Sequence, residues 1–129
     1  MPREKNKRET NISMVRLTDN EIFERLQSTA GKCGIRLTYT HKLFYLRLLE
    51  YASMYGSVRP EGLEISLSVN EMSSCLSITK RMVIQSLRAF VDCGVLLRYS
   101  SLSSAMTNKQ NTFPAKCVTI LKREFYERS

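Results

Sequence analysis

The feature that most constrains this chain is a pair of predicted helices separated by a turn of only three residues. Residues 68–71 (SVNE) form a capping-box sequence, in which a serine hydroxyl and a glutamate carboxylate accept the free N–H groups at a helix start, and a short helix is predicted to follow. Residues 77–79 are the predicted turn. Thr79 is expected to cap a longer helix that runs to about Cys93 and is ended by Gly94.

Two further helices are predicted before this pair. The first begins with the capping box at residues 18–21 and carries one apolar stripe, which consists of Ile22, Phe23, Leu26, Ala30 and Cys33. The second is expected to run from a cap at Thr40 to about Tyr55. Its apolar residues cover more than half of its circumference, so we expect it to be buried on two sides, with the first helix or a second subunit covering the outer one.

Three strands are predicted from apolar residues that follow turn signals or alternate with polar ones. They span residues 63–67, 95–101 and 116–122. A turn at residues 57–62, which contains Pro60 and Gly62, is expected just before the first strand, and the 14 polar-rich residues 102–115 separate the other two. The order of elements predicts an α+β fold that is mainly helical, with a turn of helix at the C-terminus.

Composition divides the chain into one domain with flanking segments. A charged stretch without large apolar side chains opens the chain and is expected to be flexible. The predicted segments are a basic arm (1–17), an N-terminal helical extension (18–36), the main domain (37–123) and a C-terminal tail (124–129).

Positive charge is concentrated in the second half of the chain. The net charge is +8 overall, and residues 72–123 hold eight basic residues against one acid, Asp92. A field of this kind attracts a polyanion, and nucleic acid is favoured because the surrounding composition is that of a folded domain. A membrane surface is the weaker alternative, because the basic residues do not line one face of a strongly amphipathic helix.

Residues 63–100 resemble the winged helix-turn-helix family. The residues that carry the resemblance are the cap Ser68, the threonine and two basic residues at 79–81, and the Gly-Val-Leu step at 94–96. Residues 37–97 look most like the N-terminal DNA-binding modules of phage and plasmid replication proteins and like small plasmid-type regulators. The resemblance implies a winged helix-turn-helix with a recognition helix that begins at Thr79 and a wing at 102–115.

The predicted recognition helix has two faces. Its apolar side is expected to hold Val83, Ile84, Leu87, Phe90 and Val91, and its outer side Arg81, Gln85, Arg88 and Ala89. Arginine can pair with guanine and glutamine with adenine in the major groove. Met82 is expected either to touch a thymine methyl group or to pack beside the core, and Lys109 either to contact DNA from the wing or to make no contact. The predicted DNA-binding residues are Thr79, Lys80, Arg81, Met82, Gln85, Arg88, Arg98 and Lys109.

These patterns predict a sequence-specific protein that binds double-stranded DNA, as a homodimer, and regulates transcription. Control of DNA replication is one alternative, and a winged helix that binds protein instead of DNA is another. No enzyme site, cofactor or metal is expected, because the four cysteines are scattered singly and His41 is expected to have a capping or surface role. Single cysteines, a polar N-terminus and no long apolar run predict a cytoplasmic protein with buried, reduced thiols that does not insert into membranes.

Overall fold

Pairs of helices and pairs of strands follow one another along residues 16–100 and 117–128, the part of the chain that the computed structural model describes. The helices are α2 (Asp19–Lys32), α3 (Tyr39–Tyr55), α4 (Val69–Leu76) and α5 (Lys80–Asp92), followed near the C-terminus by the single 3-10 turn η1 (Arg123–Phe125). The strands are β1 (Ser57–Arg59), β2 (Gly62–Ser66), β3 (Leu96–Ser100) and β4 (Cys117–Lys122). The predicted α+β, mainly helical class is therefore confirmed.

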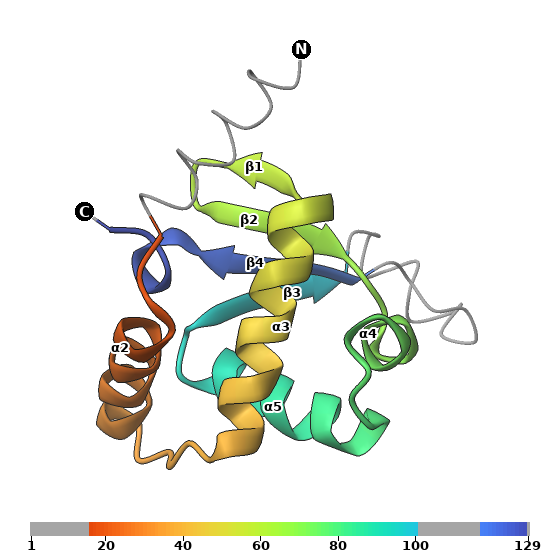
Figure 1. Cartoon of the computed structure of the whole chain (residues 1–129). Helices are drawn as coiled ribbons and strands as arrows, with labels where there is room; N and C mark the ends of the chain where they lie inside the picture. The colour runs from red at the N-terminus through yellow and green to blue at the C-terminus, as the bar shows by residue number, and fades with distance from the viewer. Residues whose placement is uncertain (1–15, 101–116, 129) are drawn as a thin grey trace.

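The four strands form one antiparallel sheet in the order β1-β2-β4-β3. Leu121 of β4 pairs with Leu63 of β2 on one side and with Leu96 of β3 on the other, so β4 joins two strands that are distant in sequence. In Figure 1, α3 crosses in front of the sheet with α2 to one side and α4 to the other. Helix α5 lies at the end of the molecule opposite β1.

Three of the helix starts are as predicted. Glu21 and Glu71 accept the N–H groups of Thr18 and Ser68, which completes both capping boxes, and Thr79 accepts the Met82 N–H at the start of α5. These local hydrogen bonds satisfy donors that a helix start leaves free, so they form wherever the right residues are spaced three apart.

The predicted start of α3 at Thr40 is wrong. The N-cap is Thr38, and α3 begins at Tyr39. The cause is His41, whose Nδ1 lies 2.9 Å from the Thr38 nitrogen and accepts its N–H, as a glutamate does in the other two boxes. His41 therefore has the capping role that was one of its two predicted roles.

The predicted turn at 57–62 is also wrong in part, because residues 57–59 form β1. Val58 pairs with Leu63, and an ion pair of 2.9 Å joins Arg59 to Glu64 across the hairpin. All three residues of β1 are exposed. The strand therefore lacks the apolar alternation on which the sequence prediction of strands depends.

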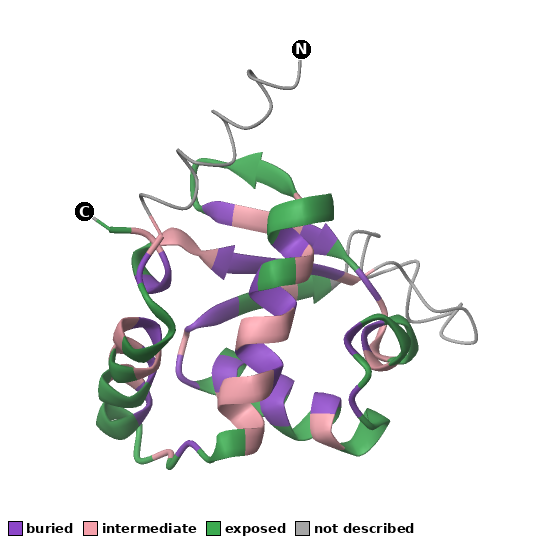
Figure 2. Ribbon diagram, viewed as in Figure 1, coloured by how far each residue is buried: buried purple, intermediate pink, exposed green. Residues whose placement is uncertain are grey.

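All four helices contribute to one hydrophobic core. Ile22 of α2, Leu48 of α3, Met72 of α4 and Val83 of α5 are completely buried. Figure 2 shows these buried faces turned toward the centre of the molecule. Helix α2 is therefore part of the same folded unit as the predicted main domain.

The segments predicted as arm and tail also reach the core. Leu17 is 4% exposed and donates its N–H to the Tyr126 carbonyl at 2.8 Å, and Tyr126 is 8% exposed. The folded unit therefore extends beyond residues 18–123 in both directions. Apolar side chains at both ends of the chain explain this, because they bury surface against each other.

Helix α3 is buried on more than one side by the chain itself. It contacts α5, α4 and β2, and Phe44, Tyr45, Leu48 and Leu49 are all inaccessible to solvent or nearly so. Its two-sided apolar pattern therefore does not require a second subunit. The homodimer stays a prediction without this support.

The expectation that the cysteines are buried is wrong for two of them. Cys33 and Cys75 are exposed, Cys93 is buried and Cys117 is half-buried. Cys33 is the C-cap residue of α2, beyond its buried stripe, and Cys75 lies on the outer side of α4. Local apolar neighbours in sequence did not indicate which face of the helix each thiol occupies.

We expect Phe90→Ala to lower the free energy of unfolding by about 3–5 kcal/mol, because Phe90 is fully buried and its removal leaves a cavity between α3 and α5. Urea unfolding measures this. Val91→Ala is the matched control, since Val91 is the next residue and is 37% exposed, and it should change stability by less than about 1 kcal/mol. Equal losses in the two variants would show that Phe90 does not anchor α5.

A second prediction concerns pH. Burial lowers the pKa of His41, so the unfolded chain takes up the imidazole proton at a higher pH than the folded chain. This contribution to stability is present above pH 6.5 and is lost as the pH falls through the lower folded pKa. His41→Gln offers an amide oxygen to the Thr38 N–H without titrating. Urea unfolding is measured at two pH values, one above and one below 6.5. The free energy of unfolding should fall less between the two pH values in the variant than in the parent. An equal fall in both proteins would rule out His41 as the source of this pH dependence.

Candidate nucleic-acid interface

The turn between α4 and α5 is held by hydrogen bonds from outside and within it. Arg47 of α3 donates from Nη1 to the carbonyl oxygens of Leu76 (2.8 Å) and Ser77 (3.1 Å). Ser73 donates from its hydroxyl to the Ile78 carbonyl at 2.6 Å. These donors satisfy carbonyl groups that the end of α4 leaves free, and they fix where α5 starts.

Ser77 gives this turn its sharp change of direction. Its φ of 55° and ψ of 46° place it in the left-handed region, where it is the only non-glycine residue with positive φ in the described part of the chain. A left-handed residue at a helix end reverses the chain so that the next helix can pack against the first. Thr79 then caps α5 two residues later.

The inner face of α5 fixes its rotation about its own axis. Val83, Ser86, Leu87 and Phe90 are buried, and the Phe90 ring lies 6.2 Å from the Phe44 ring and 5.7 Å from the Tyr45 ring, measured between centroids. Because a helix repeats every 3.6 residues, fixing these positions inward decides which side chains point outward.

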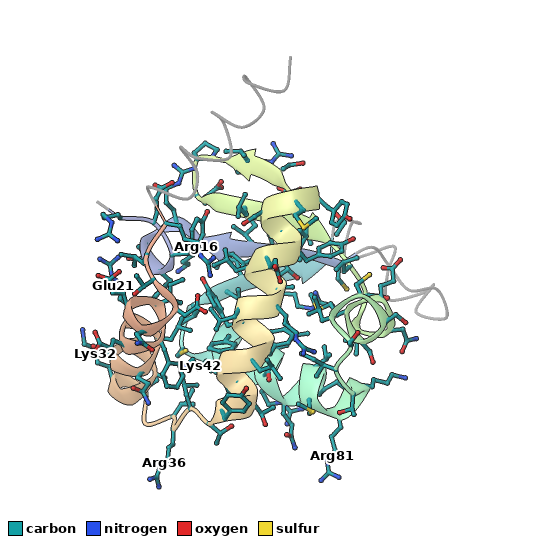
Figure 3. The ribbon with its side chains drawn as sticks, in the orientation of Figure 1. Arg16, Glu21, Lys32, Arg36, Lys42 and Arg81 are labelled. Atoms are coloured by element: carbon teal, nitrogen blue, oxygen red, sulfur yellow. The ribbon has the colours of Figure 1, made fainter. Side chains whose placement is uncertain are left out.

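The outer face of α5, called the α5 face below, consists of Arg81, Ile84, Gln85 and Arg88. All four residues are exposed, and their spacing of three, four and seven places them on one side of the helix. Arg81 and Arg88 are about 10 Å apart along the helix axis at 1.5 Å per residue. Figure 3 shows the Arg81 side chain extending from the molecule into solvent.

The basic side chains of α5 are not neutralised by neighbours. The ion pairs in residues 16–100 and 117–128 join Arg16 to Asp19, Arg59 to Glu64, Arg123 to Glu127 and Arg128 to Glu21. Lys80, Arg81 and Arg88 take part in none of them. The one acid of the helix, Asp92, comes at its last position, so the first two turns present positive charge alone.

The sequence prediction of the apolar side of α5 is wrong for two residues, Ile84 and Val91. Ile84 is 42% exposed and Val91 37% exposed, whereas Ser86, which has a hydroxyl, is completely buried. Ile84 is the residue of this candidate face that the sequence pattern missed, because an isoleucine in an amphipathic helix is normally assigned to the core. It lies between Arg81 and Arg88 on the α5 face.

The other predicted site residues are distributed differently. Thr79 caps α5, Lys80 is exposed beside the α5 face, and Met82 packs against the core, which is the second of its two predicted roles. Ala89 is half-buried. Lys109 lies outside the described residues.

Arg98 is placed inside the fold. Its Nη1 donates to the Leu67 carbonyl at 3.3 Å and to the hydroxyl of Thr119, which is fully buried. Burial lowers the pKa of the Arg98 guanidinium. These contacts tie β3 and β4 to the end of β2, where the chain enters α4, so Arg98 positions the helix pair and does not belong to the α5 face.

One further cation lies at the same end of the molecule as α5. Arg36, in the connection between α2 and α3, is exposed, and Figure 3 shows it extending from the same edge as Arg81. No periodic pattern marks Arg36, because the connection is neither helix nor strand. Its place at this edge of the molecule depends on how α2 and α3 pack.

Comparison with protein-family profiles, with curated proteins and with solved structures gave no significant match to this chain. Within the described ranges, no group of three or more His, Cys, Asp or Glu side chains is arranged to hold a metal ion. Nor does any helix of those ranges have both the length and the apolar character that crossing a bilayer requires.

We expect Arg47→Met to lower the free energy of unfolding by about 1.5–3 kcal/mol, because methionine keeps the apolar stem but cannot donate to the Leu76 and Ser77 carbonyls. Arg36→Met is the control, since Arg36 is exposed and should change stability by no more than about 0.5 kcal/mol. Urea unfolding of both variants measures these changes. If Arg47→Met has the same free energy of unfolding as the parent, the turn is held without Arg47.

Proposed function

We propose that this protein binds double-stranded DNA in a sequence-specific manner and acts as a regulator of transcription. The observation that carries the proposal is the α5 face, which combines two arginines, a glutamine and an isoleucine on one exposed side of a rigidly held helix. Control of replication is the alternative that the same surface would serve, because reading a site on DNA needs the same chemistry in both processes.

The order of elements supports a winged helix-turn-helix. A helix (α3), a two-stranded hairpin (β1 and β2), two helices (α4 and α5) and two strands (β3 and β4) follow one another, and β4 lies between β2 and β3 in the sheet. In such a fold the second helix of the motif enters the major groove, and this helix is α5 here. The wing would be the connection between β3 and β4, which lies outside the described residues.

The side chains of the α5 face match the groups in a major groove. Arginine forms paired hydrogen bonds with O6 and N7 of guanine, glutamine with N6 and N7 of adenine, and an apolar side chain contacts the thymine methyl group. Arg81, Gln85 and Ile84 offer these three contacts from one helix face. The length of the face, about 10 Å, suits a groove about 12 Å wide.

Lys80 lies beside this face and Arg36 extends from the same edge of the molecule as Arg81 (Figure 3). Both would contact phosphates, which position a protein on DNA but carry no sequence information. Their side chains make no ion pair within the described ranges, so binding a phosphate costs no existing partner. A protein-binding winged helix would be expected to carry apolar or acidic groups where Arg81, Gln85 and Arg88 stand. The basic and amide character of the face therefore favours DNA.

The test begins with selection of a preferred duplex from a random pool. We expect Arg81→Ala and Gln85→Ala to weaken binding to that duplex by about 1–3 kcal/mol each and binding to random DNA much less, which relaxes selection at one or two base pairs. Gln27→Ala, an exposed position on α2, is the matched control. If both α5 variants melt like the parent and bind the selected duplex equally well, α5 does not read DNA and the proposal fails.

The salt dependence of DNA affinity distinguishes side chains that contact phosphates from those that contact bases. Lys80→Ala should weaken binding to all duplexes by a similar factor and lower the slope of log affinity against log salt by about one unit, because one phosphate contact releases its counterion. Fluorescence anisotropy across a series of salt concentrations measures this slope. An affinity that does not change with salt would contradict an interface built on the basic side chains of α5.

A further inference from the structure

A cavity of about 240 Å³ lies at the end of the molecule opposite α5. Four parts of the chain enclose it, which are the segment before α2, the C-terminal half of α3, the β1-β2 hairpin and the residues around η1. Its walls include Arg16, Ser53, Val58, Leu63, Arg123 and Tyr126. Since a water molecule occupies about 30 Å³ in the liquid, this volume corresponds to about eight water molecules and suits a small organic molecule.

Two arginine side chains of the wall have hydrogen-bonding capacity that the fold leaves unused. The Nε atoms of Arg16 and Arg123 are buried and make no hydrogen bond within the described part of the chain, although the Arg123 Nε forms an ion pair of 3.4 Å with Glu127. The other ends of both guanidinium groups are fixed, one by Asp19 at 2.9 Å and the other by the Arg59 carbonyl at 2.8 Å. Both side chains are therefore held in place, and the Nε of Arg16 has no partner among the described residues.

A third donor without a hydrogen bond is next to these walls. The side chain of Tyr45 is completely buried, its hydroxyl has no hydrogen-bond partner among the described residues, and it interacts electrostatically with Tyr126 and Arg16. Burial raises the pKa of this hydroxyl, so it keeps its proton and can donate. Buried polar groups in folded proteins are nearly all hydrogen-bonded, so three such groups around one cavity indicate that something completes them.

The charge and the apolar walls define the ligand. Arg16 and Arg123 share the lining with one acid, Glu127, whose Oε1 is 3.4 Å from the Arg123 Nε, and Asp19 pairs with Arg16 at 2.9 Å from outside the lining. Val58, Leu63 and the Tyr126 ring supply apolar contact surface. Pockets that combine such walls with a few convergent donors bind small molecules with a polar end and an apolar body.

We propose that this cavity binds a small organic carboxylate, whose charged group is held by Arg16 and Arg123 and whose apolar body lies against Val58, Leu63 and Tyr126. Arginine suits a carboxylate because its planar guanidinium offers several donors to the two oxygens. The site does not depend on the proposed DNA binding, since α5 contributes none of its walls. The two proposals can therefore fail separately.

The experiment titrates the isotope-labelled full chain with phenylacetate, and with phenylacetamide as the neutral molecule of the same shape, by heteronuclear NMR. We expect phenylacetate to bind with a Kd of about 1 mM or tighter, to shift the amide signals of Leu63 and Tyr126, and to bind at least about tenfold more tightly than the amide. Arg123→Met should weaken phenylacetate binding by at least about tenfold, because it removes the guanidinium.

A cavity-filling variant supplies the structural control. Ser53 is exposed on α3 at the cavity wall, so Ser53→Phe should fill the cavity and abolish binding, whereas Met54→Phe, at the next and equally exposed position, should bind like the parent. Melting curves establish that both variants fold. The proposal is overturned if phenylacetate does not bind at about 10 mM, if the amide binds equally well, or if Ser53→Phe binds like the parent.

Discussion

The contact between Phe90 of α5 and the rings of Phe44 and Tyr45 in α3 is the interaction on which the rest of the structure depends. It lies at the centre of the single core, and it fixes the rotation of α5 about its axis. Because a helix repeats every 3.6 residues, turning Phe90 inward turns Arg81 and the rest of the α5 face outward. The proposed interface is therefore a consequence of core packing, and a helix rotated by a quarter turn would bury part of it.

The start of α5 depends on a second interaction, which is polar. Arg47 reaches from α3 to the carbonyl groups at the end of α4, and Ser77 adopts the left-handed conformation that turns the chain between the two helices. Arg98 acts in a similar way at the other end of α4, where it ties the end of β2 to β4. Two arginines thus make hydrogen bonds within the fold, and those on the outer side of α5 form no ion pair with any residue that the structure describes.

Helix α3 connects the two ends of the molecule. The ring of Tyr45 contacts Phe90 on the side of α5, and its hydroxyl interacts with Arg16 and Tyr126 on the side of the cavity. The proposed carboxylate site and the proposed DNA interface therefore share one buried side chain. Packed interiors resist gradual deformation. Binding at one end of the molecule would therefore have to move α3 or Tyr45 in order to change the structure at the other end.

The sequence by itself determined what local spacing controls, which is the caps at Thr18, Ser68 and Thr79, the end of α5 near Gly94 and the exposed positions of Arg81 and Gln85. Capping hydrogen bonds and helical periodicity act within a few residues, so they can be inferred without the fold. Only the tertiary structure decided the exposure of Ile84, the internal role of Arg98 and the cavity around Arg16. Each of these depends on which distant segments meet, and burial between such segments leaves no periodic signal along the chain.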